Sequence, residues 1–274
     1  MTQAAVTSVQ GQVWGAQGKR GVAPRTLPEE TPVAITCNGT TQAVMMATPA
    51  DLQDFAVGFA TTEGYATFDQ IEQVEIMPLK TGIEAQLWVK DAQAKALADR
   101  RRAMLGPVGC GLCGIDALDQ AVRPLPRLNV ALTLSWAEAT AAPDVLRGAQ
   151  PLHDATHAVH AAGFLRPGQG LIMAREDVGR HNALDKLIGA LLRGGIAPST
   201  GVFVLTSRVS IEMVQKTVMA QCPILIAVSA PTAHAVRMAD DAGLTLAAFA
   251  RGTRLELFSH PDRIVTQGEN SDAA

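Results

Sequence analysis

Residues 202–249 read VFVLTSRVSIEMVQKTVMAQCPILIAVSAPTAHAVRMADDAGLTLAAF, and this stretch decides the fold class of the C-terminal half. It contains three apolar runs that alternate with two segments of helical periodicity; the runs are 202–206, 224–228 and 244–249, and the segments are 209–221 and 232–242. Short apolar strands that alternate with helices are typical of a parallel sheet buried on both faces. The sequence therefore predicts an α/β C-terminal part with helices flanking the sheet.

The N-terminal half mixes strand and helix signals, which predicts an α+β fold. Asn38-Gly39 separates two β-prone runs, 33–37 and 41–46, and favours a hairpin because both turn positions tolerate a positive φ. Thr48-Pro49-Ala50-Asp51 resembles a capping box and predicts a helix over 49–63. Two further strands and a helix are predicted at 71–77, 83–90 and 91–104.

Changes in composition predict the domain boundaries. Residues 1–28 lack apolar periodicity and 266–274 are polar, so both ends are expected to be flexible. The α+β domain is predicted over 29–122, a Pro-rich linker over 123–151, and the second domain over 152–265.

The composition is that of a soluble globular protein. The 274 residues are 47% hydrophobic and 18% charged, and 23 Lys and Arg against 26 Asp and Glu give a net charge of −3. This balance predicts neither a nucleic-acid nor a membrane partner. The absence of a long apolar segment and of a signal-peptide core predicts a cytoplasmic protein. Four cysteines are too few for a disulfide framework in a chain of this length.

Polar side chains follow each of the three C-terminal strands. They lie in Thr206-Ser207-Arg208-Val209-Ser210, in Ser229-Ala230-Pro231-Thr232, and in Phe249-Ala250-Arg251-Gly252-Thr253-Arg254. Because the carboxyl ends of parallel strands meet at one edge, where helix N-termini point outward, these segments predict a phosphate or pyrophosphate pocket. In the alternative interpretation Ser207, Ser210 and Ser229 cap helices and the arginines are surface charges.

A second polar cluster, Arg175-Glu-Asp-Val-Gly-Arg-His-Asn182, precedes an amphipathic helix at 183–192. Asp177 or Asn182 can cap that helix, and Arg180 with His181 can bind phosphate or a purine edge. The alternative is a solvated turn of ion pairs. His153, His157 and His160 lie close together in the sequence, but no neighbouring carboxylate completes a metal site.

Gly109-Cys110-Gly111-Leu112-Cys113-Gly114 places two cysteines three residues apart among glycines. Such a dithiol suits half of a zinc site, a redox disulfide or a persulfide carrier. Zinc is disfavoured because Cys37 and Cys222 lie in or beside apolar runs, and because no His-x-Glu or Cys-x-Glu triplet of a zinc deaminase occurs. The flanking glycines and Pro107 favour a mobile loop over a redox motif that opens a helix, and mobility favours a carrier.

From about residue 29 to 264 the sequence resembles the FdhD family of formate dehydrogenase accessory sulfurtransferases. The resemblance rests on five motifs: Cys110-Gly-Leu-Cys113-Gly114, residues 175–186, Ser207-Arg-Val-Ser210 with Glu212-Met-Val-Gln-Lys216, Val228-Ser-Ala-Pro-Thr232, and Phe249-Ala-Arg-Gly252. It implies a cytidine-deaminase-like C-terminal fold without the deaminase zinc ligands, and a homodimer.

The resemblance also implies a function. Such a protein takes persulfide sulfur from a cysteine desulfurase and passes it to the molybdenum (or tungsten) bis-guanine-dinucleotide cofactor, which then enters the formate dehydrogenase catalytic subunit. Cys110 matches the persulfide-forming cysteine and Cys113 its partner, and no metal is held by the protein alone. The residues expected to bind the cofactor are Phe249, Ala250, Arg251, Gly252, Thr253, Arg254, Ser207, Arg208, Ser229, Arg180, His181 and His160.

One segment departs from the family pattern. Thr156-His157-Ala158-Val159-His160-Ala161 stands where the family usually reads Thr-Gly-Gly-x-His-Ala, so two glycines are replaced. If those glycines let the backbone approach the cofactor, that contact is altered here.

Two other classes of function remain as alternatives: a non-catalytic chaperone that binds the cofactor, and a zinc-containing nucleotide-binding or deaminase-like enzyme. The basic run Arg100-Arg101-Arg102 is a solvated helix end or a docking point for the desulfurase.

Overall fold

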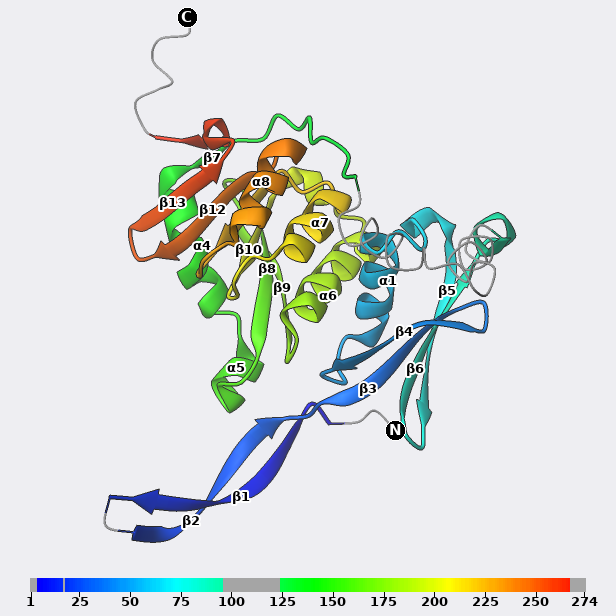
Figure 1. Cartoon of the computed structure of the whole chain (residues 1–274), viewed down its shortest axis with the longest axis vertical. Coiled ribbons are helices and arrows are strands. Elements are labelled where there is room, and N and C mark those ends of the chain that lie inside the picture. Colours follow the sequence, from blue (N-terminus) through cyan, green and yellow to red (C-terminus); the bar gives the residue numbers. More distant parts are fainter. Residues whose placement is uncertain (1–3, 17, 96–123, 267–274) are drawn as a thin grey trace, which may run out of the picture.

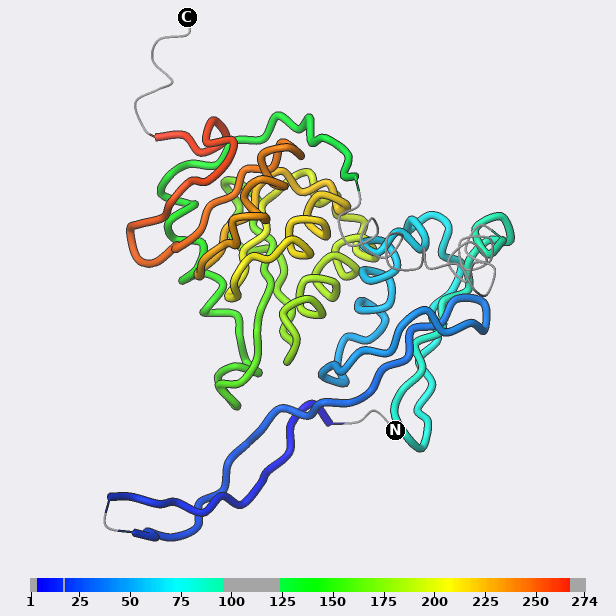
Figure 2. The backbone as a smooth tube through the Cα atoms, viewed as in Figure 1, coloured from blue at the N-terminus to red at the C-terminus, as the bar shows by residue number. Residues whose placement is uncertain are grey.

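The computed structural model describes residues 4–16, 18–95 and 124–266, and the chain begins with a long antiparallel ribbon (Figure 1). Its strands are β1 (Val6–Gly15) and β2 (Gly18–Pro28), which we call the arm; it projects away from the rest of the molecule (Figure 2). The expectation of a flexible N-terminal end over 1–28 is therefore corrected, because most of these residues form two paired strands. The strands pair along their full length, from Val6 opposite Pro28 to Gly15 opposite Gly18, and this mutual pairing is invisible in composition.

The arm leads into a four-stranded sheet in the order β4-β3-β6-β5. Its strands are β3 (Thr31–Cys37), β4 (Thr40–Ala47), β5 (Ile71–Leu79) and β6 (Gly82–Val89). The predicted hairpin is confirmed, because Asn38 and Gly39 join β3 to β4 with φ of 44° and 74°. A short 3₁₀ turn, η1 (Phe68–Gln70), precedes β5.

Helix α1 (Leu52–Thr62) covers one face of this sheet. It begins three residues later than predicted, since Asp51 is the N-cap and has a left-handed backbone with no side-chain cap. Residues 91–95 are helical, as predicted. The rest of the helix predicted over 91–104, the run 100–102, and Cys110 and Cys113 lie outside the described residues.

The C-terminal half contains a six-stranded mixed sheet in the order β13-β12-β11-β10-β8-β9. The strands are β8 (His160–Arg166), β9 (Gly170–Asp177), β10 (Val202–Leu205), β11 (Ile224–Ala227), β12 (Thr245–Arg251) and β13 (Arg254–Ser259). β10, β11 and β12 are parallel, which confirms the prediction from residues 202–249. The outer strands are antiparallel to their neighbours, so the sheet as a whole is mixed.

Helices cover both faces of this sheet (Figure 1). α6 (Arg180–Arg193), α7 (Ile211–Met219) and α8 (Ala233–Ala242) pack on one face, where Phe203 and Leu205 join their core. α4 (Trp136–Arg147) packs on the other face with Val202 and Val204. The alternate residues of β10 therefore serve two cores, which explains why its sequence is apolar throughout.

The predicted linker over 123–151 is wrong, because most of its second half is α4. Ser135 and Glu138 form a capping box that begins the helix, and Pro143 lies inside it. A proline inside a helix removes one backbone hydrogen bond, but Pro143 is buried among the residues that face the sheet. Short elements complete the part of the chain that the structure describes: β7 (Leu134–Ser135), α5 (Pro151–Thr156), η2 (Pro198–Thr200), η3 (Pro261–Arg263) and β14 (Ile264–Val265).

The two halves meet where α1 crosses α6, at a pair of glycines. A Cβ atom on Gly58 would overlap the backbone carbonyl of Asp185, and one on Gly189 would overlap that of Asp54. Both positions thus require glycine for close approach rather than for a special φ. The backbones touch directly, so this crossing sets the position of the N-terminal sheet against the C-terminal one.

Candidate functional site

Residues from two of the three predicted segments, 206–210 and 249–254, lie together at one edge of the sheet, whereas 229–232 adds none to the cavity lining. Thr206 follows β10, Val228 follows β11, Arg251 ends β12 and His160 begins β8, and all four line one cavity of about 470 Å³. Arg147 and Gln150 help to form the wall on the α4 side. We call this the edge cavity; its size lies within the range of ligand pockets.

Two arginines lie side by side where β12 turns into β13, and one of them, Arg251, lines the edge cavity. Arg251 and Arg254 are cross-strand partners at the β12–β13 turn, and both are exposed. Neither forms an ion pair among the described residues. Like charges opposite each other in a sheet are destabilising, so this pair favours an anionic ligand that bridges them.

Phe249 stands just before this turn in an unusual conformation. Its φ is 52°, its side chain is 46% exposed, and its ring lies 6.1 Å from that of Phe258. A positive φ on a bulky residue costs free energy, and such strain gathers at functional sites. The exposed ring offers a face on which a base can stack.

His160 links the edge cavity to the second polar cluster. Burial, and then the charge of Arg180, hold the pKa of His160 below its usual value, while Asp177 acts in the opposite direction. The imidazole is therefore neutral at pH 7 and can both donate and accept a hydrogen bond. Thr206 is engaged within the fold, since its Oγ1 accepts a 2.9 Å bond from the Ala161 amide.

Arg180 and His181 lie at the N-terminus of α6. Burial, followed by the charges of Arg180 and Lys216, lowers the pKa of His181 to about 4. His181 Nε2 lies 3.9 Å from Glu212 Oε2, and His181 Nε2 and Arg180 Nε are buried without a hydrogen-bond partner. Both nitrogens are enclosed by the protein at the N-terminus of α6, the end of a helix that favours anions.

The remainder of the motif at 175–186 fastens the C-terminal half to the N-terminal one. Arg175 binds the Asp54 carboxylate at 2.9 Å, Lys186 binds the Asp177 carboxylate at 2.6 Å, and Asp177 accepts a bond from the Thr48 amide. The N-cap of α6 is Gly179 rather than Asp177 or Asn182, although Asp177 accepts a bond from the Gly179 amide. The partners Asp54 and Thr48 lie far from this motif in the same chain, so nothing in the sequence indicates the contacts between them.

Lys216 on α7 adds further ion pairs at the junction of the two halves. Its ammonium group binds Asp185 at 2.9 Å and Glu63 at 2.7 Å. Burial alone would lower the pKa of Lys216, but the attraction of Asp185 and Glu63 raises it. Lys216, which belongs to a family motif, thus has a structural role here.

The predicted serines and Arg208 lie apart from the edge cavity lining. Ser207 is buried and donates to the Arg208 carbonyl, and Arg208 is exposed. Helix α8 is capped by Thr232, whose hydroxyl accepts from the Ala235 amide at 3.2 Å, so the expected cap at Ser229 is wrong.

His157 occupies a backbone conformation that glycine favours. Its φ is 56° at the C-cap of α5, and its ring packs 5.4 Å from that of His153. His157, which stands where the family usually has glycine, thus has a left-handed backbone here. The structure describes no group of three His, Cys, Asp or Glu residues that could hold a metal ion.

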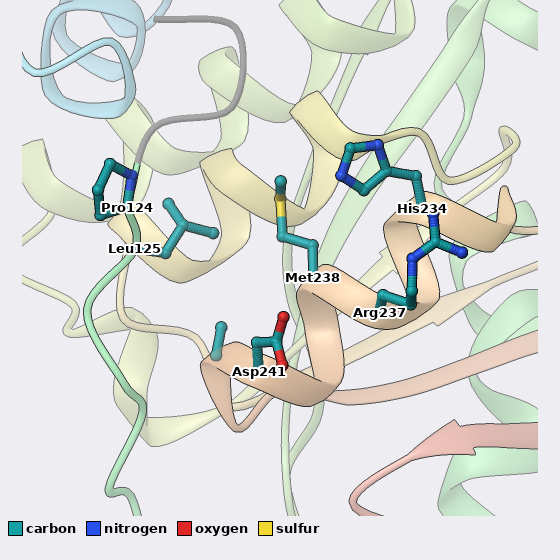
Figure 3. Close-up of a pocket in the computed structure, with 7 residues that line it drawn as sticks. Pro124, Leu125, His234, Arg237, Met238 and Asp241 are labelled. Atoms are coloured by element: carbon teal, nitrogen blue, oxygen red, sulfur yellow. The ribbon is translucent and has the colours of Figure 1, made fainter. Parts of the chain in front are cut away.

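The prediction that Cys37 and Cys222 are core residues is confirmed, since both are buried. Burial raises the pKa of the Cys222 thiol to about 12. No helix in the described ranges is long and apolar enough to cross a membrane. A second cavity of about 320 Å³ lies between Pro124-Leu125 and α8, and none of the predicted site residues line it (Figure 3).

The sheet with its flanking helices and its edge cavity define a mixed α/β protein with a cavity at the carboxyl ends of its parallel strands, the place where such folds bind ligands. A model of the FdhD/NarQ family matches residues 28–265, so the chain belongs to that family and the resemblance is confirmed. Proteins called "Sulfur carrier protein FdhD" are similar: that of Agrobacterium fabrum is 50% identical over 251 residues (91% of this chain, 93% of the relative), and that of Brucella abortus 51% over 243 residues (88% and 90%).

A solved structure shares the fold. A putative formate dehydrogenase accessory protein from Desulfotalea psychrophila superimposes with a TM-score of 0.75 at 26% identity, covering 96% of this chain and all of that one. The mixed α/β architecture with several sheets is thus common to both chains.

Proposed function

We propose that this protein is a sulfur carrier for formate dehydrogenase maturation. It receives persulfide sulfur from a cysteine desulfurase and transfers it to the molybdenum or tungsten bis-guanine-dinucleotide cofactor, which is its substrate and is passed on to the formate dehydrogenase catalytic subunit. One observation carries the proposal: a chain that contains Cys110 and Cys113, and that is similar to named sulfur carriers, has a cavity of ligand size with Arg251 in its lining.

The atoms and electrons of the proposed sulfur transfer balance without a cofactor held permanently by the protein. The Cys110 thiolate attacks the outer sulfur of the desulfurase persulfide, the S–S bond there breaks, and the desulfurase thiolate leaves. Cys113 then attacks the inner sulfur of the Cys110 persulfide and displaces hydrosulfide for delivery to the metal. The delivered sulfur gains the two electrons that the cysteines lose on forming a disulfide, and a cellular thiol reductant restores the pair.

The described residues supply the binding step. Arg251 and Arg254 hold a pyrophosphate at the rim of the edge cavity, and the exposed ring of Phe249 stacks on a base. His160, neutral at pH 7, donates a hydrogen bond without adding charge. Arg180 and His181 offer donors at the N-terminus of α6.

Replacing both Arg251 and Arg254 with alanine should weaken GDP binding at least about tenfold, because a charge-assisted hydrogen bond contributes about 1.5–3 kcal/mol. Isothermal titration calorimetry measures the change. Arg237→Ala is the matched control, since Arg237 is also an exposed arginine but lies at the other cavity (Figure 3). Equal GDP affinity of the double variant and the wild type would contradict the anion site.

We also propose that the protein is a homodimer in which the second copy covers the arm. Val9, Val13 and Leu27 are each more than 40% exposed and lie on one face of the arm, and an isolated two-stranded ribbon is only marginally stable. Residues 4–28 carry three basic and no acidic side chains.

The complementary surface is the face of the four-stranded sheet opposite α1. Val44, Met46 and Met77 are exposed there beside Glu75 and Glu84. Apolar contacts and opposite charge both favour this pairing between copies. Light scattering is expected to give the mass of a dimer for the full chain and of a monomer after deletion of residues 1–28; a full-chain monomer would refute the pairing.

A further inference from the structure

Gln150 lies in the wall of the edge cavity, and its side chain carries a buried hydrogen-bond acceptor without a donor. The residue is 2% exposed, and its Oε1 has no hydrogen-bond partner. Its backbone carbonyl is occupied, because it accepts a 3.0 Å bond from the Asp154 amide at the start of α5. A buried polar atom without a partner costs about 1–3 kcal/mol, and a ligand that supplies the partner recovers that free energy.

The surroundings of Gln150 suit a flat heterocycle. Pro143, Val159, Val228 and Ala250 add apolar surface to the same cavity. His153 is the only other residue of the lining with a buried unpartnered side-chain atom, Nδ1. An apolar cavity with a few convergent polar groups is the usual form of a small-molecule site.

The lining of the edge cavity also includes charged side chains. Arg251 stands at the end of β12, whereas Arg147 on α4 binds Asp154 at 2.6 Å and Asp144 adds a carboxylate to the lining. A nucleotide has an anionic end and a neutral base. Arg251 can bind the anionic end, and the Gln150 amide can bind the base.

We infer that Gln150 is a specificity-determining residue that hydrogen-bonds the Watson–Crick edge of a purine base in the edge cavity. This rests on the proposed function, which makes the base guanine. The side-chain amide carries one acceptor and two donors, and guanine presents the N1–H donor beside the O6 acceptor. Gln150 Oε1 accepts from N1–H, and Gln150 Nε2 donates to O6.

Calorimetry with GDP and 1-methyl-GDP tests this contact. Gln150→Met keeps the length of the side chain and removes the amide, and should weaken GDP binding about tenfold. Methylation of N1 removes the donor, so it should weaken binding to the wild type about tenfold and to Gln150→Met by less than twofold. A residue with a purely structural role would not alter the response to N1 methylation.

The outcomes separate the inference from the proposed function. Gln42→Met, at a partly buried glutamine on β4 outside the edge cavity, should behave as wild type. The assignment of Gln150 is overturned if Gln150→Met binds GDP as tightly as the wild type. It is also overturned if N1 methylation of GDP weakens binding to the variant and to the wild type by the same factor. If the wild type binds no GDP, the nucleotide part of the proposed function fails instead. Melting temperatures confirm that each variant is folded.

Discussion

Replacing Cys110 with alanine is expected to abolish sulfur loading and to reduce formate dehydrogenase activity in cells to background. Persulfide transfer needs a thiolate that another protein can reach. Cys37 and Cys222 are buried, and the pKa of about 12 keeps Cys222 protonated at pH 7, so neither can replace Cys110. Intact-mass spectrometry after incubation with desulfurase and cysteine should show one added sulfur on the wild type and none on the variant.

Two further variants make this test specific. Cys222→Ala is the matched control and should load sulfur as the wild type does. Cys113→Ala should load sulfur but release it slowly, because no neighbouring thiol displaces it. Formate dehydrogenase that matures normally with Cys110→Ala would refute the sulfur carrier and support the alternative, a chaperone that binds the cofactor without chemistry.

Replacing Gly189 with alanine is expected to lower the free energy of unfolding by at least about 3 kcal/mol, the upper end for an overpacked core. The new Cβ would overlap the backbone carbonyl of Asp54 on α1. Backbone cannot rotate away as a side chain can, so the two helices must separate. Their separation also pulls Asp54 away from Arg175 and Arg193, which both bind its carboxylate.

Urea unfolding monitored by circular dichroism measures this loss. Gly148→Ala is the matched control: Gly148 is the C-cap of α4 with φ of −69°, and the nearest atom to its new Cβ would be 3.6 Å away. Its stability should stay within about 1 kcal/mol of the wild type. Equal stability of the Gly189→Ala variant and this control would show that the crossing of α1 and α6 is not tightly packed.

The sequence was sufficient to predict those elements whose structure is determined by the residues of one short segment. The Asn38-Gly39 turn is confirmed because only a few residue types accept its backbone conformation. The three parallel strands are confirmed because most of their residues are buried on both faces, which makes β10 and β11 apolar throughout and β12 apolar apart from Thr245 and Arg251. The meeting of His160 with Arg251 at one edge follows from that topology.

Elements that depend on a distant partner were missed. The arm exists through pairing of β1 with β2, and α4 is a helix despite Pro143 because Ala139, Ala142 and Leu146 pack on the sheet. The arm has the composition of a loop, and its regular structure depends on contacts that composition does not record. The segment of α4 carried a local signal that the linker prediction did not use, because it is rich in alanine and begins with the capping box of Ser135 and Glu138.

The sequence by itself determined the family, the cysteine pair and the parallel strands that place cationic side chains at one sheet edge. Only the tertiary structure decided that most of the motif at 175–186 joins the two halves, because its partners Thr48 and Asp54 lie more than 100 residues away. The tertiary structure also decided that Arg147 and Gln150 complete the edge cavity, since they come from a segment that reads as a linker. The physical reason is that the buried polar groups of the motif need partners, which folding rather than sequence proximity supplies, and that the wall of the cavity forms only when α4 packs on the sheet.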